Sequence, residues 1–304
     1  MPALRKARAL SSGATIGIAA PAFAVDPRSV EAGEAQLREA GFTTVRRSDL
    51  TDRSGYLAGG DRRRVREFMD LVDDDRVDAI LCARGGYGCH RIVADLDPLR
   101  VRAAAKPLVG FSDITTLLLW QRKCAGLVGF HAPMLERGEG MLPEELDSLF
   151  RALRGDRAPV MKGESHGGGR GEGPVIGGSL TLLAASLGTP WEVDTRGAIL
   201  LFEDVCEKPY ALDRLLQQLR AAGKLDGLAG VGVGHLLDCV DPKRETPSAE
   251  DVVLEALAPL GIPIALGLPF GHGHPNLTWP FGVRGALDGE RGELEILESG
   301  VERG

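Results

Sequence analysis

The fold is indicated first by one run of the sequence, KPLVGFSDITTLLLW at residues 106–120. Its first part, Pro107–Gly110, is a short apolar segment of the length expected for a buried strand. The run then passes directly into the helical pattern of Asp113–Arg122. A short buried strand that leads straight into a helix is typical of an α/β protein with a parallel sheet.

The same alternation of strand and helix patterns extends on both sides of this run, from the start of the chain to about residue 150. Further strands are predicted at Thr15–Ala19, Thr43–Arg46, Val77–Cys82 and Leu127–Phe130. Helices are predicted at Ser29–Ala40, Asp61–Val72 and Pro143–Leu153. We therefore expect residues 1–150 to form one domain, an open parallel sheet covered by helices.

The apolar segment nearest the N-terminus has a second interpretation. Basic residues precede it, and the tripeptide AFA at 22–24 resembles a signal-peptidase site, so Thr15–Ala19 could belong to a secretory signal. The tripeptide SSG at 11–13 interrupts the apolar run, however, and Pro21 ends it after the length of a strand. The pattern favours a buried first strand and a cytoplasmic protein.

A glycine-rich stretch separates the two halves of the chain. Residues 163–173, with the sequence GESHGGGRGEG, carry too few apolar side chains to pack a core. We predict a linker or flap over residues 151–173 and a mixed β/α domain over residues 174–304. In that second domain, strands are predicted at Ala198–Phe202 and Gly230–Val233, and helices at Ser179–Ser186, Tyr210–Ala222 and Ala249–Ala258.

The composition argues against several classes of function. The chain has 304 residues, of which 43% are hydrophobic and 26% charged, and its formal net charge is -7. This acidic balance argues against nucleic acid as a partner, since nucleic-acid-binding proteins usually present a basic surface. No apolar run is long enough to span a membrane. The five cysteines include no C-x-x-C pair, which predicts reduced thiols rather than disulfides or a zinc site.

Two segments of the first domain could carry chemistry. In GFS at 110–112 a strand turns into a helix, and such a turn can expose a serine nucleophile beside the N–H groups of the helix start. Because Ile114 replaces the last glycine of the G-x-S-x-G pattern, Ser112 or Asp113 could instead be an ordinary N-cap. The segment RGGYG at 84–88 could present backbone N–H groups to a ligand, or could simply be a tight turn.

Two segments of the second domain complete the candidates. Glu203 and Asp204 end an apolar strand, where a carboxylate could orient an imidazole or be solvated. Adjacent strand side chains point to opposite faces, so only one of the two can face a given site. His272 lies between glycines in a loop and could act as a base. The pair of His272 and His274 raises a metal site as the alternative, although no H-E-x-x-H motif accompanies it.

Taken together and in this order, these segments resemble the LD-carboxypeptidase family, also known as the S66 serine peptidases. The resemblance spans nearly the whole chain, and its most specific parts are RGGYG at 84–88 and GFSD at 110–113. The other matching segments are IGIAAP at 16–21, HAPM at 131–134, EDV at 203–205, PY at 209–210, DR at 213–214 and GH at 271–272. Two segments depart from the usual pattern: HAPM replaces HGPM, and GGSL at 177–180 replaces GGNL. These departures bear on the choice of substrate.

The resemblance implies a flavodoxin-like first domain and a catalytic triad of Ser112 as nucleophile, His272 as base and Glu203 as orienting acid. It also implies an oxyanion hole made by the backbone N–H groups of Gly86 and Asp113. Since the triad residues come from both domains, the active site is expected between them. No metal or organic cofactor is implied.

The expected reaction is hydrolysis of an L,D-peptide bond that releases terminal D-alanine from murein tetrapeptides, in cell-wall recycling. A related branch of the family hydrolyses peptidyl-nucleotide antibiotics and is the first alternative. A non-catalytic module that binds a small molecule is the alternative of a different class. Arg84, the cation nearest the glycine turn, is expected to bind the substrate carboxylate, with an ion pair inside the protein as its alternative. A homodimer is a possible assembly of such a protein.

Overall fold

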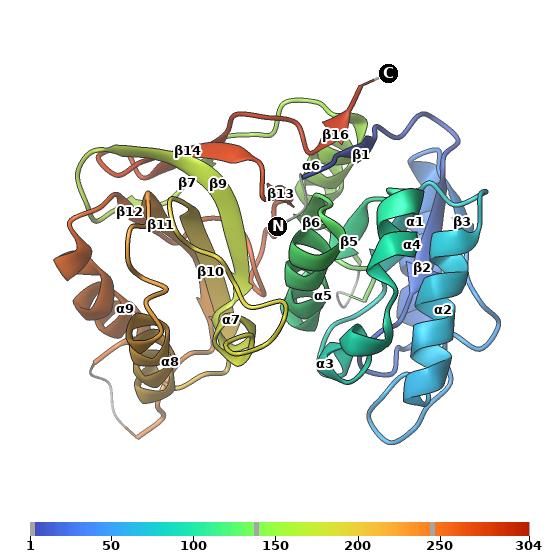
Figure 1. Cartoon of the computed structure of the whole chain (residues 1–304), viewed down its shortest axis with the longest axis horizontal. Coiled ribbons are helices and arrows are strands. Elements are labelled where there is room, and N and C mark those ends of the chain that lie inside the picture. Colours follow the sequence, from blue (N-terminus) through green and yellow to red (C-terminus); the bar gives the residue numbers. More distant parts are fainter. Residues whose placement is uncertain (1–3, 137–139, 244–246, 304) are drawn as a thin grey trace. The chain divides into compact units, whose positions relative to one another are not determined.

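The computed structural model describes residues 4–136, 140–243 and 247–303 (Figure 1). The chain divides into two compact units. The first comprises residues 1–156 together with 278–280 and 299–304, and the second comprises residues 157–277 and 281–298. The end of the chain therefore returns to the first unit, whereas the sequence assigned all of residues 174–304 to the second.

Within the described residues, the first unit is built on a six-stranded sheet with the order β13-β6-β5-β4-β2-β3. Its strands are β2 (Thr15–Ala19), β3 (Thr43–Val45), β4 (Ala79–Cys82), β5 (Leu108–Gly110), β6 (Gly129–His131) and β13 (Trp279–Phe281). Strands β2 to β6 pair in parallel. The order β3-β2-β4-β5-β6 is that of a flavodoxin-like sheet, which confirms the predicted fold of this part of the chain.

Helices follow the strands of this sheet, as right-handed crossovers between parallel strands require. They are α1 (Pro27–Glu39), α2 (Asp61–Asp73), α3 (Cys89–Ile92), α4 (Pro98–Ala104), α5 (Thr115–Trp120) and α6 (Pro143–Arg154). Shorter turns are η1 (Val93–Asp95), η2 (Ser112–Ile114) and the π-type η3 (Gln121–Ala125), and a small parallel pair is formed by β1 (Ala7–Arg8) and β16 (Val301–Glu302). The helices α3 and α4, which both contact α2, were not predicted.

The direction of the connections reverses between β2 and β4. The chain leaves β2 toward β3 at one side of the sheet, and the later strands β4, β5 and β6 add to the other side. In open α/β sheets such a reversal leaves a crevice outside the carboxyl ends of the strands, where ligands bind. The segments that follow β2, β4 and β5 are therefore the ones placed for function.

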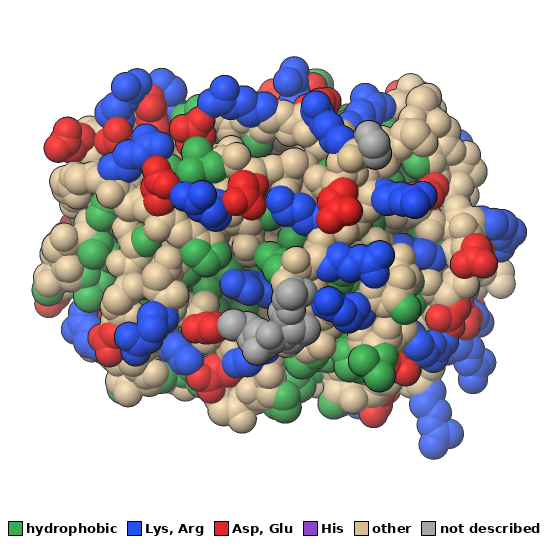
Figure 2. All heavy atoms as spheres, turned by 45° about the horizontal axis from the view of Figure 1, so that its top comes forward, with side chains coloured by type: hydrophobic (Ala, Val, Ile, Leu, Met, Phe, Trp, Pro, Cys, Tyr) green, Lys and Arg blue, Asp and Glu red, His purple; other side chains and the backbone are tan. Residues whose placement is uncertain are grey.

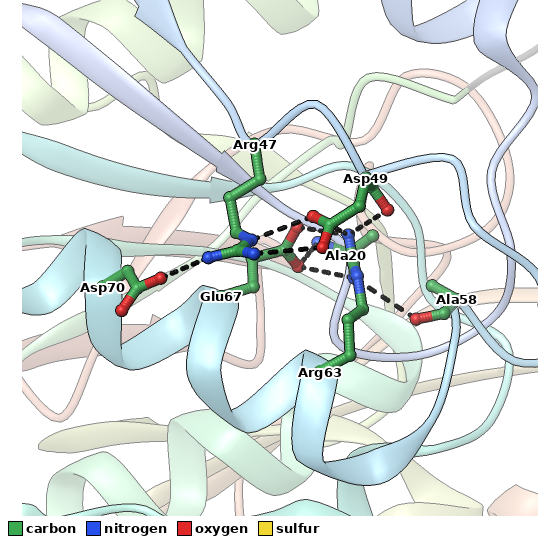
Figure 3. Close-up of polar contacts among 7 residues, drawn as sticks. All are labelled: Ala20, Arg47, Asp49, Ala58, Arg63, Glu67 and Asp70. Atoms are coloured by element: carbon green, nitrogen blue, oxygen red, sulfur yellow. Dashed lines mark hydrogen bonds and ion pairs between the residues drawn. The ribbon is translucent and has the colours of Figure 1, made fainter.

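A partly buried ionic network lies where β2 ends (Figure 3). The side chain of Glu67 on α2 is fully buried, and its Oε2 accepts the Ala20 N–H at 2.7 Å. Arg63 Nη2 donates to Glu67 Oε1 at 2.8 Å and to the Asp49 carbonyl at 2.6 Å. Burial raises the pKa of Glu67 to about 7, against the opposing charge of Arg63. The remaining residues of the network are Arg47, Ala58 and Asp70.

This network predicts a specific dependence of stability on pH. The pKa of Glu67 is higher in the folded protein, about 7, than its ordinary value of 4.5. Its contribution to stability is therefore fully present below pH 4.5 and is lost as the pH rises through 7. Relative to Glu67→Gln, which does not titrate, the wild-type free energy of unfolding should fall by up to about 3 kcal/mol between pH 5 and pH 8. Urea unfolding of both proteins at each pH measures this fall. The prediction is contradicted if the free energy of unfolding of wild type minus that of Glu67→Gln stays constant or grows with pH.

The second unit is built on a mixed sheet. In the described part of the chain this sheet has eight strands in the order β7-β15-β14-β9-β10-β11-β12-β8. Its strands are β7 (Met161–Lys162), β8 (Glu164–Ser165), β9 (Arg170–Ser179), β10 (Ile199–Val205), β11 (Gly230–Leu237), β12 (Ile264–Leu266), β14 (Arg284–Asp288) and β15 (Glu293–Ile296). The central strands β9 to β12 are parallel, and the outer pairs are antiparallel. This confirms a mixed β/α architecture.

The helices of this unit connect its central parallel strands. They are α7 (Leu180–Ala185), α8 (Pro209–Ala221) and α9 (Ala249–Leu257), with the short turn η4 (Ala258–Leu260) after α9. Because the strands β9 to β12 are adjacent in chain order, right-handed crossovers place these helices on the same face of the sheet (Figure 1). The polar and functional groups at the carboxyl ends of β10 and β11 therefore lie at one edge of this layer.

The predicted linker over residues 151–173 differs from the structure. Residues 151–154 belong to α6, and residues 164–165 and 170–173 of the glycine-rich stretch lie in the strands β8 and β9. A Cβ at Gly171 would lie 1.8 Å from the Ala229 carbonyl oxygen, and one at Gly173 would lie 2.1 Å from that of Gly197. At Gly171 and Gly173, glycine occurs because a neighbouring backbone passes close to the strand.

Acidic and basic side chains are interspersed over the face drawn in Figure 2. The chain forms many exposed ion pairs, such as Arg284 with Glu172 at 3.0 Å and Lys162 with Glu293 at 2.9 Å. Exposed pairs of this kind contribute little stability each, because water and salt screen them. The apolar cores of the two units therefore contribute more.

None of the described helices is both long and apolar enough to cross a membrane.

Candidate active site

Ser112 has a backbone conformation that residues other than glycine seldom adopt. It follows β5 almost directly and begins η2, with a φ of 61°. A residue held in this region typically costs about 1–3 kcal/mol and persists only where its surroundings enforce it. The preceding Phe111 is buried and packs on the fully buried His131, whose ring stacks on Trp279 at a centroid distance of 4.8 Å. This packing fixes the sharp turn from strand to helix that presents Ser112.

The glycine turn after β4 lies directly against this serine. A Cβ at Gly85 would lie 2.9 Å from Ser112 Cβ and 3.0 Å from Ser112 Oγ. The next residue, Gly86, has a φ of 102°, and a Cβ there would lie 2.4 Å from the Phe23 ring. The Phe23 N–H donates to the Gly85 carbonyl at 3.2 Å. The structure thus brings together the two segments of the first unit that the sequence identified.

Asp113, the residue after the serine, uses its side chain within the fold. Its buried carboxylate accepts the Cys89 N–H through Oδ2 at 2.8 Å, and burial raises its pKa. Its backbone nitrogen lies on the side of Gly85, at 3.4 Å from the position of a Cβ there. The backbone groups of Gly86 and Asp113 therefore belong to adjoining segments of one unit.

In the second unit, Glu203 and His272 form a hydrogen-bonded pair. His272 Nδ1 lies 2.6 Å from Glu203 Oε2, and the backbone N–H of His272 donates to the same oxygen at 3.2 Å. The Glu203 side chain is fully buried, whereas 19% of the His272 side chain is exposed. A buried carboxylate at Nδ1 favours the tautomer that carries its proton there, which leaves Nε2 able to accept a proton.

Asp204 points away from this pair, as the alternation of strand side chains requires. Its Oδ2 accepts hydrogen bonds from the backbone N–H and the hydroxyl of Thr181, both at 2.8 Å. Burial, together with the neighbouring charge of Glu203, raises the pKa of Asp204 to about 6. Asp204 thus stabilises the first turn of α7, and Glu203 is the carboxylate that contacts the imidazole.

The loop that carries His272 depends on the glycines on both sides of it. Gly271 has a φ of 105°, and a Cβ there would lie 2.7 Å from Glu203 Cβ. A Cβ at Gly273 would lie 2.6 Å from the ring of His235. Asn276, which the sequence did not single out, accepts the Gly271 N–H through Oδ1 at 2.8 Å. Glu203 and His235 therefore fill the space on either side of the loop and set the position of His272.

The alternative of a metal site at His272 and His274 has no support in the geometry. His272 Nδ1 contacts Glu203, and His274 is exposed. In residues 4–136, 140–243 and 247–303 no group of three or more His, Cys, Asp or Glu side chains is arranged to hold a metal ion.

Arg84 makes an ion pair inside the protein. Its Nη1 donates to Glu136 Oε1 at 2.7 Å and to the Ala24 carbonyl at 3.0 Å. Its guanidinium lies over the Phe23 ring, 5.6 Å from the centroid. These contacts match the structural alternative that the sequence left open, and contact with a substrate carboxylate stays a prediction.

A cavity of about 520 Å³ lies within the second unit, and neither His272 nor Glu203 lines it. It lies at the carboxyl ends of β11 and β12 and beside the start of α9. His235 is one of its lining residues, and its backbone N–H donates to the Phe270 carbonyl at 2.9 Å. The charged and titratable residues of its lining are Glu164, His166, His235, Glu250 and Asp251. Acidic side chains of this kind favour a ligand that carries a positive charge.

The fold is of the α/β class, and Glu203 and His272 form a carboxylate–imidazole pair of the kind that hydrolases use. The LD-carboxypeptidase N-terminal domain matches residues 16–132, and the LD-carboxypeptidase C-terminal domain matches residues 172–287. The chain therefore belongs to the LD-carboxypeptidase family and is a peptidase.

Relatives match over nearly the full length of both chains. The probable murein peptide carboxypeptidase of Bacillus subtilis (strain 168) is 36% identical, over 98% of this chain and 96% of its own. The crystal structure of muramoyltetrapeptide carboxypeptidase from Oxalobacter formigenes has a TM-score of 0.84 at 28% identity, over 93% of this chain and 97% of that one. The microcin immunity protein MccF in complex with glutamyl sulfamoyl guanosine has a TM-score of 0.88 at 25% identity, over 98% and 99%.

Proposed function

We propose that this chain is a serine-type LD-carboxypeptidase that releases terminal D-alanine from murein tetrapeptides, in the cytoplasm, as part of cell-wall recycling. Its nucleophile is Ser112, its base His272 and its orienting acid Glu203. The observation that carries the proposal is the 2.6 Å contact between Glu203 Oε2 and His272 Nδ1, since it prepares Nε2 to accept a proton. The positive φ of Ser112 supports the choice of nucleophile.

The proposed reaction proceeds in two halves through an acyl-enzyme. Ser112 Oγ attacks the carbonyl carbon of the L,D-peptide bond while His272 Nε2 takes the hydroxyl proton. The tetrahedral intermediate collapses, the C–N bond breaks, and His272 returns the proton to the amine of the departing D-alanine. Water then attacks the acyl-Ser112 ester with His272 again as base, which regenerates the hydroxyl. Glu203 stabilises the imidazolium in both halves.

The oxyanion of each tetrahedral intermediate is proposed to bind the N–H groups of Gly86 and Asp113. The close approach of Gly85 to Ser112 supports this assignment, because it brings the glycine turn beside the nucleophile. Two preorganised donors at the developing negative charge are a large source of rate acceleration in acyl transfer.

The identity of 36% to the probable murein peptide carboxypeptidase of Bacillus subtilis, against 25% to MccF, supports the murein peptide over the nucleotide alternative. The similarity to MccF, whose structure holds glutamyl sulfamoyl guanosine, keeps hydrolysis of peptidyl nucleotides as the second candidate function.

A substrate panel tests the proposal. The purified protein is incubated with a murein tetrapeptide, with the same peptide ending in L-alanine, and with an aminoacyl sulfamoyl nucleotide, and the products are identified by mass spectrometry. We expect cleavage of the first compound only, with release of D-alanine. Cleavage of the nucleotide compound alone would assign the chain to the alternative activity.

A covalent probe assigns the nucleophile in the same experiment. A fluorophosphonate should transfer its phosphonyl group to Ser112 Oγ, with loss of fluoride, and stop the reaction, because a base-activated hydroxyl reacts where an ordinary N-cap does not. Ser112→Ala should lose both labelling and hydrolysis. Ser112→Ala that keeps full activity, or wild type that binds the tetrapeptide without cleaving it, contradicts the serine mechanism; the second result would favour the non-catalytic binding module.

A further inference from the structure

Arg64 is a buried charge that the proposed mechanism does not use. It lies on α2, and its side chain has 0% exposure. Its Nη1 donates to the Pro21 carbonyl at 2.5 Å and to the Gly88 carbonyl at 2.9 Å, and its Nη2 pairs with Asp61. Its Nε has no hydrogen-bond partner among the described residues. Burying a guanidinium is costly and is often no net source of stability. We therefore ask what else its contacts with the two carbonyls do.

These carbonyls belong to the loops that follow β2 and β4, at the reversal point of the sheet. The Gly88 carbonyl ends the turn that begins at Gly85, and the proposed oxyanion donor Gly86 lies between them. At the first end, the Gly85 carbonyl accepts the Phe23 N–H at 3.2 Å. At the other end, the Gly88 carbonyl accepts from Arg64. The turn is thus held at both of its ends, and Arg64 also fixes the loop that supplies Phe23.

The Gly88 segment also connects Arg64 to Asp113, the second proposed oxyanion donor. Gly88 has a φ of 146°, and a Cβ there would lie 2.6 Å from Arg64 Nη1, so the guanidinium packs directly on this backbone. The next residue, Cys89, donates its N–H to Asp113 Oδ2 at 2.8 Å. The charge of Arg64 also opposes the rise in the pKa of Asp113 that burial causes. A continuous chain of contacts therefore joins Arg64 to the segments of both proposed donors.

We infer that Arg64 is a positioning residue for the oxyanion hole. Its guanidinium fixes the Gly88 carbonyl and thereby the orientation of the turn whose Gly86 N–H faces the developing oxyanion. Arg64 acts through the backbone and touches no reacting atom. The inference rests on the proposed function, because it assigns a task to the same turn.

The test compares Arg64→Met with Arg66→Met, an exposed arginine on the same helix. Hydrolysis of a murein tetrapeptide is measured per active site, titrated with a fluorophosphonate. For Arg64→Met we expect kcat to fall about 10- to 100-fold, as for a small misplacement of a catalytic group, with KM within about threefold of wild type. Arg66→Met should match wild type. Arg64→Lys keeps a donor without the fork and should give an intermediate kcat.

A purely structural role gives a different result. It lowers the free energy of unfolding but leaves kcat per titrated site unchanged, and that outcome in Arg64→Met overturns the inference. If Arg64→Met does not fold, Arg64→Lys decides with the same two measurements: a kcat equal to that of wild type overturns the inference. Wild type that neither cleaves the peptide nor reacts with the fluorophosphonate removes the proposed function, and the inference with it.

Discussion

Replacement of Glu203 by Gln is expected to lower kcat by roughly 10⁴-fold while fold and substrate affinity stay nearly unchanged. Glu203 Oε2 accepts from both Nδ1 and the backbone N–H of His272, and its side chain is fully buried. A glutamine amide in this position can donate to Nδ1, which places the imidazole proton on Nε2. The base then has no lone pair to offer Ser112. Steady-state kinetics on a murein tetrapeptide measure the effect.

Asp204→Asn is the matched control, since it makes the same change, from carboxylate to amide, at the adjacent residue. Asp204 contacts Thr181 and not His272, so this change should lower stability by about 1 kcal/mol and leave kcat within a few-fold. The double change Glu203→Gln with His272→Ala should cost little more than His272→Ala alone, because members of one catalytic unit are not additive. A crippled Asp204→Asn beside a nearly normal Glu203→Gln would show that the acid is wrongly assigned.

The second large effect is expected at Gly85, where Ala should lower kcat by about 10²- to 10³-fold. Its methyl group would lie 2.9 Å from Ser112 Cβ and 3.0 Å from Ser112 Oγ, distances that folded proteins avoid. Either the serine or the glycine turn must move, and both carry groups that the proposed reaction needs. The fluorophosphonate labelling rate should fall in parallel with kcat.

Gly168→Ala serves as the control for adding a methyl group to a glycine. Apart from Gly168 itself and its two chain neighbours, no described residue lies within 4 Å of its Cβ position, so kcat should not change. Thermal unfolding of both variants separates a local displacement from a general loss of structure. A folded Gly85→Ala protein with kcat within threefold of wild type would contradict the proposed place of this turn.

The parts of the fold that could be predicted are those where local pattern and environment agree. Strands such as β2 and β5 are apolar runs that end at a glycine or proline, and their parallel pairing follows from the helices between them. The short helices α3 and α4 could not be predicted, because four to seven residues carry too little periodicity. The antiparallel strands β14 and β15 could not be predicted, because the glycines in this part of the sequence indicate a loop.

Parts of the candidate site were predictable for a different reason. Ser112, Glu203 and His272 lie in unusual local sequences, whereas Arg64 lies in a helix with three other arginines, Arg62, Arg63 and Arg66. Such a run normally indicates a solvated face. Only the fold shows that Arg64 points inward to two backbone carbonyls. The sequence also does not show that Asn276 supports the His272 loop. The hydrogen bond from the Gly271 N–H to Asn276 Oδ1 depends on the turn of the backbone between the two residues.

The glycines of β9 also bear on how this chain tolerates change. At Gly177 a Cβ would lie 1.6 Å from the Leu201 carbonyl oxygen, and Gly171 and Gly173 meet backbone oxygens almost as closely. This stretch, whose composition resembles a spacer, thus contains three positions where no side chain fits. An engineer who chose residues 170–177 for an affinity tag or a fused domain would be cutting into the central sheet. Substitutions at Gly171, Gly173 and Gly177 should therefore disrupt this sheet, although none of the three is a reactive group.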